Sequence, residues 1–302
     1  MQVTEISVCI ATHMRLDGLR KLLQSLVDQA EAPAFDVIVV DNDRGQTARR
    51  VAEDFSELLC LQYLVEPERG LARVRNRAVA ASNAKFVAFV DDDEWASPGW
   101  LASLHVVAKS TDADAVIGPV RIHFGADVPN YVRACHYFEE SVLPDGAIVP
   151  WYLTRTSNAL VRRSSMPDME CPFLTKFDLT GGEDIDLFQR MISRGAVIRA
   201  ARTALVYEDR PVQRANLHWI ARRAVRNGVF KAETNWRDVS LPRRLWRGAK
   251  AGAKSMRSAV AAAVLWGIDR DLAVRRIIDA GESAGNVAYV LGLRVEEYRH
   301  HS

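Results

Sequence analysis

The sequence contains little cysteine and no long apolar run. Its four cysteines are widely separated and form no C-x-x-C pair, which argues against a disulfide framework or a zinc knuckle and favours small buried thiols in a reducing compartment. The longest uncharged apolar run, residues 258–268, is too short for the ~20 residues of a membrane-spanning helix. Low-complexity tracts and internal repeats are also lacking, which excludes a disordered chain and a solenoid.

What the chain does contain is the composition of a soluble globular protein. Of its 302 residues, 48% are hydrophobic and 26% are charged, which suffices for one large domain with an appendage or for two domains. Residues 5–11 (EISVCIA) already read as a strand, so we expect no signal peptide before them. The sequence therefore predicts a cytoplasmic protein and leaves peripheral contact with the inner face of the membrane open.

Positive charge is concentrated in one block. Residues 219–257 hold eleven Lys or Arg and two Asp or Glu, a local charge of +9, so the rest of a chain of net charge +2 carries −7. Such a block indicates an anionic partner: phosphates, nucleic acid or an acidic lipid surface. A solvated helical face is the simpler interpretation of a charge run alone.

The chain up to residue 200 alternates between two hydrophobic periods. Continuous apolar runs predict buried strands, which are expected at residues 6–11, 35–42, 61–65, 85–90, 113–118, 156–164 and 196–200. Stripes of apolar residues three and four apart predict helices, which are expected at residues 17–27, 46–55, 70–82, 98–109 and 181–195. This alternation predicts an α/β protein with a mostly parallel sheet flanked by helices.

Two further regions follow from the pattern. Residues 119–150 read as an irregular inserted loop region, and the chain from residue 219 reads as mostly helical, with an interruption at Pro242. We expect a domain of residues 1–230, made of halves 1–118 and 119–230, and a basic helical subdomain of residues 231–302.

Polar clusters follow three of the predicted strands, at residues 12–13, 41–43 and 91–94. In parallel sheets the carboxyl ends of the strands form the ligand-binding edge. The four consecutive acids (DDDE, 91–94) repel one another and lose hydration where buried. Hard oxygen donors of this kind suit Mg²⁺ or Mn²⁺, which commonly shares one or two carboxylates with substrate phosphates. The alternative is that Asp93 and Glu94 serve the N-terminus of the next helix, where negative charge is favourable.

Five segments in order resemble those of inverting family 2 glycosyltransferases of the GT-A fold. They are ISVCIATHMRLDGLRKLLQSL (6–26), VIVVDND (37–43), RGLARVRNRAVAAS (69–82), FVDDDEWASPGWL (89–101) and GGEDIDLFQR (181–190). The resemblance spans residues 5–230, with Val74 where the family usually has alanine. It implies an enzyme that moves a sugar from a nucleotide-sugar donor, expected to be a UDP-sugar, and makes residues 1–230 the catalytic domain.

The resemblance also implies donor-binding residues. Thr12 and Asp41 would contact the nucleoside, with Asp41 accepting from the uracil ring. Arg75 would lie near the base or the diphosphate, although a surface arginine is an equally good interpretation of that residue. Arg214 is a further candidate for the diphosphate, because arginine forks match phosphate oxygens.

For the metal, the resemblance implies that Asp93 coordinates Mg²⁺ or Mn²⁺ most directly. Asp91 and Asp92 would hold the ribose hydroxyls and the waters on the metal, with Asp91 as a second ligand. Many relatives place a histidine after the helix of residues 181–195. Here the third ligand is open between Glu208 and His218.

Asp184 is the expected general base. An inverting transfer needs a carboxylate that removes the proton of the acceptor hydroxyl as its oxygen attacks the anomeric carbon, and the metal stabilises the departing diphosphate. Glu183 would orient the acceptor. Without the resemblance, both residues read simply as first-turn acids that complement a helix dipole.

The basic tail is similar to that of bacterial exopolysaccharide transferases of the succinoglycan type. The similarity implies a glycan or a polyprenyl-diphosphate-linked acceptor and no nucleic-acid partner. Residues 243–257 combine tryptophan and leucine with positive charge, as interfacial helices do, so contact with an anionic membrane is expected.

Three alternatives have distinct requirements. A sugar nucleotidyltransferase should have a glycine-rich basic loop after the first strand, and ATHMRLDG (11–18) is not one. A metal-dependent nuclease or polymerase would not explain Asp41 or the GGED segment. A non-catalytic nucleotide- or membrane-binding protein needs only the basic tail and an inert pocket, and metal with UDP would then fail to raise the melting temperature.

Overall fold

The computed structural model describes residues 4–135, 137–138, 142–178 and 181–293. Packing divides the chain into two compact units, which we name the sheet unit (Met1–Arg121 and Glu140–Glu208) and the helical unit (Ile122–Glu139 and Asp209–Ser302). The boundary expected at residue 230 lies inside a helix of the second unit.

A seven-stranded, mainly parallel sheet forms the sheet unit, with the strand order β3-β2-β1-β4-β8-β6-β9. Its strands are β1 (Ile6–Thr12), β2 (Phe35–Asp41), β3 (Leu61–Val65), β4 (Phe86–Phe89), β6 (Ala115–Ile117), β8 (Ala159–Arg162) and β9 (Ile198–Ala200). Strands β1 to β4 run parallel, and β8 is antiparallel to both of its neighbours. The predicted α/β class and the predicted strands are confirmed.

Helices pack on this sheet because each carries one apolar face. They are α1 (Leu16–Val27), α2 (Arg49–Asp54), α3 (Leu71–Ala81), α4 (Trp100–Ser110) and α6 (Glu183–Ser193). In α1 the predicted stripe of Leu19, Leu22, Leu23 and Leu26 is fully buried. Helix α3 packs on β1 and β2. The core therefore lies between the sheet and these helices, as the apolar periodicity requires.

A second, three-stranded sheet was not predicted. It has the order β5-β10-β7, from β5 (Glu94–Ala96), β10 (Val206–Arg210) and β7 (Val120–Phe124). Strands β5 and β10 pair antiparallel, which sets Glu208 opposite Glu94. The strands are short and carry charged residues, so the sequence contains no apolar run that would predict them. Residues 119–150 also contain helix α5 (Asn130–Ala134), and 3-10 turns occur at Trp151–Leu153, Arg163–Ser165, Thr175–Phe177 and Val212–Arg214.

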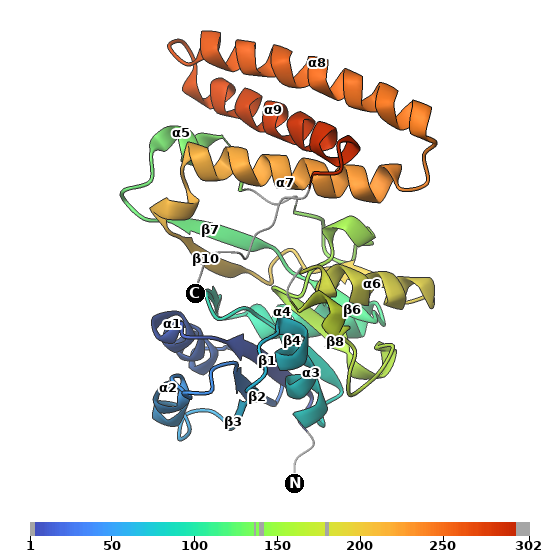
Figure 1. Ribbon diagram of the computed structural model, residues 1–302. Helices are drawn as coiled ribbons and strands as arrows, with labels where there is room; N and C mark the ends of the chain where they lie inside the picture. The colour runs from blue at the N-terminus through green and yellow to red at the C-terminus, as the bar shows by residue number, and fades with distance from the viewer. Residues whose placement is uncertain (1–3, 136, 139–141, 179–180, 294–302) are drawn as a thin grey trace. The chain divides into compact units, whose positions relative to one another are not determined.

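Three long helices make up most of the helical unit: α7 (Leu217–Trp236), α8 (Leu241–Leu265) and α9 (Arg270–Val290). Helix α9 lies between the other two and packs on both (Figure 1). The approach of α7 and α9 depends on glycine, since a Cβ on Gly285 would lie 2.0 Å from the carbonyl oxygen of Val225. Pro242 sits in the first turn of α8, where a proline is tolerated, so it begins a helix.

Within the described residues, none of the helices combines the length and the apolar character needed to cross a bilayer.

Candidate active site

The carboxyl ends of β1, β2 and β4 meet at one edge of the sheet. Register places Thr12 opposite Asp41 in the β1–β2 pair, and β4 lies on the other side of β1. The Thr12 hydroxyl donates a hydrogen bond of 2.8 Å to Asp92 in the turn after β4. The three polar clusters expected at this edge therefore come together.

Asp41 is completely buried and already accepts three hydrogen bonds. Its two carboxylate oxygens accept from the backbone N–H groups of Asp43 and Ala48, both at 3.0 Å, and from the Tyr63 hydroxyl at 2.7 Å. Desolvation and the neighbouring Asp41 charge raise the pKa of Tyr63. Asp41 thus shapes the loop after β2, and its expected contact with a uracil ring stays a prediction.

Asp92 is 5% exposed and is held from β1 and from the turn after it. Besides Thr12, it accepts 2.9 Å from Arg15, which also pairs with Asp93 at 2.8 Å. Burial raises the pKa of Asp92 to about 6, against the opposing effect of the Arg15 charge. Arg15 was not selected from the sequence. The only signal was a basic residue in the first strand-to-helix turn.

Glu94 hydrogen-bonds back to Asp91 within residues 91–94, which we name the acidic turn. Its carboxylate accepts 2.9 Å from the backbone N–H of Asp91, and its own N–H donates 3.1 Å to the Asp91 carbonyl. Burial first, and then the Asp91 charge, raise the pKa of Glu94 well above its usual value. Within the described part of the chain, no side-chain hydrogen bond caps α4, whose N-cap is Gly99. The first turn of α4 contains no acidic residue, so neither Asp93 nor Glu94 caps it directly, and a favourable effect of their charge on that N-terminus stays a prediction.

Arg75 joins the acidic turn to helix α6. It is 6% exposed, so it is not the surface arginine that the sequence left open. One of its guanidinium nitrogens donates 3.1 Å to Asp91 and another donates 2.5 Å to Glu183. Burial raises the pKa of Glu183, and the Arg75 charge opposes that rise.

Asp184 follows Glu183 in the first turn of α6 but is in a more open environment. Glu183 is buried at 4% exposure, whereas Asp184 is half-buried and accepts 2.8 Å from the N–H of Ile185. Gly181 and Gly182 precede the helix with φ of +72° and +95°, which only glycine adopts readily. The two glycines let the chain enter α6 abruptly and leave Asp184 accessible at its start.

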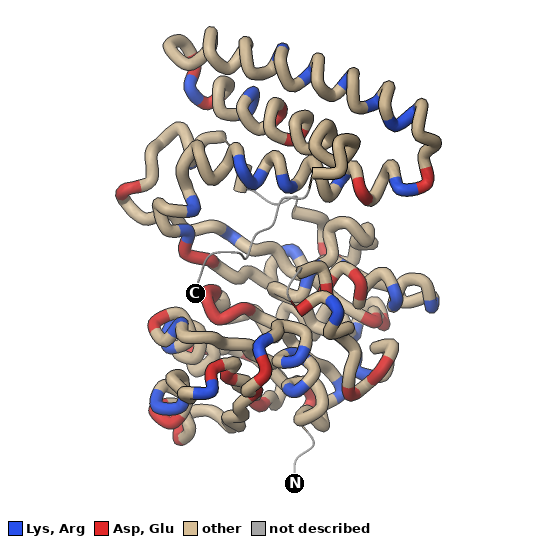
Figure 2. The backbone as a smooth tube through the Cα atoms, viewed as in Figure 1, with Lys and Arg blue, Asp and Glu red and all other residues tan. Residues whose placement is uncertain are grey.

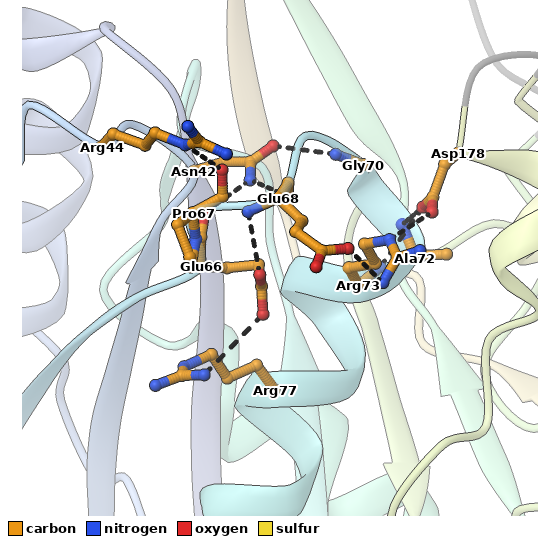
Figure 3. A network of polar contacts seen from close by, with 10 residues as sticks. All are labelled: Asn42, Arg44, Glu66, Pro67, Glu68, Gly70, Ala72, Arg73, Arg77 and Asp178. Carbon is orange, nitrogen blue, oxygen red and sulfur yellow. Dashed lines mark hydrogen bonds and ion pairs between the residues drawn. The ribbon is translucent and has the colours of Figure 1, made fainter.

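A network of polar contacts fixes the start of α3 (Figure 3). Asn42 donates to the carbonyls of Glu66 and Glu68 and accepts from the N–H of Gly70. Asp178 accepts 3.0 Å from the N–H of Ala72 and 3.1 Å from the Arg73 side chain. A carboxylate at a helix N-terminus is favourable, so a residue from far along the chain caps α3.

Gly70 is necessary in this network. Its φ is +157°, and a Cβ at this position would lie 2.3 Å from the Asp178 carboxyl carbon. A side chain at position 70 would therefore displace the Asp178 carboxylate from the start of α3, the helix that carries Arg75.

The acidic turn can supply only part of the coordination shell of a divalent cation. Among the described residues, no three His, Cys, Asp or Glu side chains gather as a metal site. Asp91 and Asp93 do keep side-chain exposures of 41% and 31%. Mg²⁺ bound through one or two carboxylates, with substrate phosphates completing its shell, is compatible with these two residues.

The other expected ligands lie in different surroundings. Glu208 lies on β10 opposite Glu94. Arg214 ends a 3-10 turn of the helical unit, and His218 lines an apolar groove of that unit. Their expected roles stay predictions.

Sequence comparison decides the family. The model of glycosyl transferase family 2 matches residues 7–170. The chain belongs to glycosyl transferase family 2. This family 2 chain is 32% identical over 305 residues to the succinoglycan biosynthesis protein ExoM of Rhizobium meliloti, a match that covers 98% of this chain and 96% of that relative.

Other relatives of this glycosyltransferase agree. The pre-mycofactocin glycosyltransferase of Mycobacterium tuberculosis is 33% identical over 239 residues, which cover 74% of this chain and 46% of that protein. The crystal structure of S. aureus TarS 1–349 in complex with UDP superposes with a TM-score of 0.56 at 18% identity, covering 98% of this chain and 93% of that one. The resemblance to family 2 and the GT-A fold predicted from it are confirmed.

We expect Arg75→Met to lower the free energy of unfolding by about 3–5 kcal/mol, because it leaves buried Glu183 without its partner. Adding Glu183→Gln should recover part of that loss, because the unpaired charge is then gone. Urea denaturation of the single and double variants measures both effects.

The matched control is Arg77→Met on the same helix. Arg77 is 45% exposed and lies 3.8 Å from Glu66, so its loss should cost no more than about 1 kcal/mol. An equal loss of stability in Arg75→Met and Arg77→Met would contradict a buried ion pair. So would strictly additive effects of Arg75→Met and Glu183→Gln on the free energy of unfolding.

The raised pKa of Asp92 predicts that the free energy of unfolding decreases as the pH rises. Asp92 titrates near pH 6 in the folded chain and near pH 3.9 when unfolded, so between these values the folded state binds more protons. The free energy of unfolding should therefore fall as pH rises through this window, by on the order of 3 kcal/mol for this group. Denaturation from pH 4 to 7 in EDTA should show a shallower fall for Asp92→Asn, and parallel profiles would overturn the assignment.

Proposed function

We propose that this family 2 glycosyltransferase transfers a sugar from a UDP-sugar to a glycan or polyprenyl-diphosphate-linked acceptor, with inversion at the anomeric carbon. Assembly of an exopolysaccharide is the proposed setting. The near full-length similarity to a succinoglycan biosynthesis protein supports that setting. The structures of TarS with UDP and with UDP-GlcNAc, which share the fold, support the donor.

One observation carries the proposal. Arg75 bonds both to Asp91 of the acidic turn and to Glu183, the neighbour of Asp184. The same buried cation therefore links the acidic turn, expected to hold the diphosphate, to the residue next to the expected base. A donor held at the acidic turn would lie within reach of the start of α6.

Each carboxylate of the proposed site has a distinct environment. Asp91 and Asp93 would hold Mg²⁺ or Mn²⁺, which when bound would neutralise charge on the departing nucleoside diphosphate. Asp92, held by Thr12 and Arg15, would keep the turn in place beside the ribose. Glu208 or His218 as a further ligand and Arg214 as a diphosphate contact belong to the same proposal.

Asp184 would accept the proton of the acceptor hydroxyl as that oxygen attacks the anomeric carbon. Glu183 is less suited to this role because its carboxylate is buried and paired with Arg75. It would position the first turn of α6, and through it Asp184. The basic C-terminal region would contact an anionic membrane, where a lipid-linked acceptor is found.

The nucleotide site is tested by calorimetric titration of UDP, GDP, CDP and dTDP into the protein with and without Mn²⁺. We expect UDP to bind only with metal, and Asp93→Ala to weaken that binding at least about tenfold, as loss of one charge-assisted contact does. Asp54→Ala is the control, since Asp54 also pairs with an arginine, Arg20, on the surface of the same unit. If none of the four nucleotides binds under either condition, the proposed donor site is wrong. The alternative of a non-catalytic binding protein would then be favoured.

Replacement of the base separates chemistry from binding. We expect Asp184→Asn to lower sugar transfer by about 10²–10⁴-fold, the usual contribution of a general base, while UDP affinity stays unchanged. Asp186→Asn, on the same helix and paired with Arg190 at 2.6 Å, should keep most of the activity. Full activity of Asp184→Asn in a radiolabelled-sugar transfer assay would exclude this residue as the base.

A further inference from the structure

Helix α8 carries positive charge without any negative charge. Its basic residues are Arg243, Arg244, Arg247, Lys250, Lys254 and Arg257, and Leu241–Leu265 contains no Asp or Glu. Figure 2 shows blue segments repeating along this helix with no red between them. At 1.5 Å per residue the helix is ~37 Å long, so the charge is spread over an extended surface.

A row of exposed apolar residues runs along the side of α8 that faces away from α9. Trp246, Met256, Val260 and Val264 are between 59% and 72% exposed, and exposed Ala249 and Ala253 continue the same row. Successive members are three or four residues apart, so they share one face of the helix. The buried residues of α8, which include Gly248, Ala251 and Ser258, lie on the opposite side. The row presented outward thus contains four large apolar side chains.

Three of the basic residues form a second row along one edge of that apolar row. They are Arg243, Lys250 and Arg257, which are spaced by seven residues, and each lies within one turn of a residue of the apolar row. Lys250 also lies over the Trp246 ring, 3.6 Å from its centroid. Tryptophan and basic side chains beside an exposed apolar row are typical of helices that lie in the plane of a membrane surface.

On its other edge the apolar row continues into a groove. Ala259 and Ala263, next to Val260 and Val264, line a groove of about 760 Å³ between α7, α8 and α9. Its walls are mostly apolar residues, together with the polar residues His218, Arg222 and Ser255. A polyanion such as nucleic acid matches the basic row but leaves this continuous apolar surface in water, whereas a bilayer matches both.

We propose that the outward face of α8 binds an anionic lipid bilayer, with Trp246, Met256, Val260 and Val264 inserted at the headgroup level and the basic row on the lipid phosphates. This inference rests on the membrane contact of the proposed function and names its surface and lipid class. Its test uses neither donor nor acceptor, so its failure would leave sugar transfer and nucleotide binding standing.

The test is flotation of the full chain with vesicles of phosphatidylcholine alone or mixed with phosphatidylglycerol. We expect binding to the mixed vesicles only, and a loss of binding at raised salt. Arg243→Gln/Lys250→Gln/Arg257→Gln should weaken it on the order of a hundredfold, since each basic residue contributes roughly fivefold. Met256→Glu/Val260→Glu should weaken it at least about tenfold, because both side chains leave the interface.

Matched controls lie on the sheet unit. Arg50→Gln/Arg121→Gln/Arg202→Gln removes the same charge from exposed positions, and Leu58→Glu/Val106→Glu replaces residues that are 60% and 62% exposed. Both should bind as the unmodified chain does. Circular dichroism of each variant checks that α8 is intact. We expect unchanged helix content, because the substituted residues of α8 are exposed.

Insertion has its own signal. Mixed vesicles should shift tryptophan emission to shorter wavelength in the unmodified chain, and Trp246→Phe should remove most of that shift. Three results would overturn the proposal. The first is equal binding to neutral vesicles, and the second is unchanged binding of Met256→Glu/Val260→Glu, which would make the binding purely electrostatic. The third is a dimer in sedimentation that dissociates in this double variant. The last would assign the face to a second copy of the chain.

Discussion

The buried guanidinium of Arg75 is the interaction on which the arrangement of the site depends. It extends from α3 and bonds at once to the turn after β4, through Asp91, and to the first turn of α6, through Glu183. A buried charge is costly unless it is paired and hydrogen-bonded, so the three segments are mutually dependent. The constraints on α3 itself, the Asp178 cap and the Gly70 turn, extend this dependence along the edge of the sheet.

The same logic explains how four consecutive acids are tolerated. Each carboxylate has a different compensation: Asp91 has Arg75, Asp92 has Thr12 and Arg15, Asp93 has Arg15, and Glu94 has a backbone N–H. Their environments therefore differ, from a half-exposed Asp91 to a buried Glu94 with a raised pKa. Asp91 and Asp93 therefore stay accessible, whereas Asp92 and Glu94 are buried and held by neighbouring groups.

The helical unit uses a different principle. Glycines let α9 pack closely against its neighbours, as Gly285 does against the Val225 carbonyl, and the buried residues of α8 are all small: Gly248, Ala251, Ser258 and Ala262. Large apolar and basic side chains are left on the outer face of α8. Apolar and basic side chains on one exposed face are the combination on which the proposed contact with a membrane rests.

Much of the sheet unit could be predicted from the sequence, because hydrophobic period is a local property. The α1 stripe, the strands from β1 to β4 and the acids at their ends follow from residues close together in the chain, and so do the five family segments. The short strands β5 and β10 could not be predicted, because their pairing depends on a partner more than a hundred residues away. The position of Pro242 at the start of a helix, and not at a break, was also missed.

Within the site, the sequence by itself determined the candidate residues other than Arg15, since residue type and order along the chain are sufficient to select candidates. Only the tertiary structure decided their partners: Arg15 with Asp92, Arg75 with Glu183, and Asp178 with the start of α3. It also separated Glu183 from Asp184, adjacent acids that differ in burial. The physical reason is that charge compensation and desolvation depend on neighbours in space, and chain folding, not sequence spacing, brings those neighbours together.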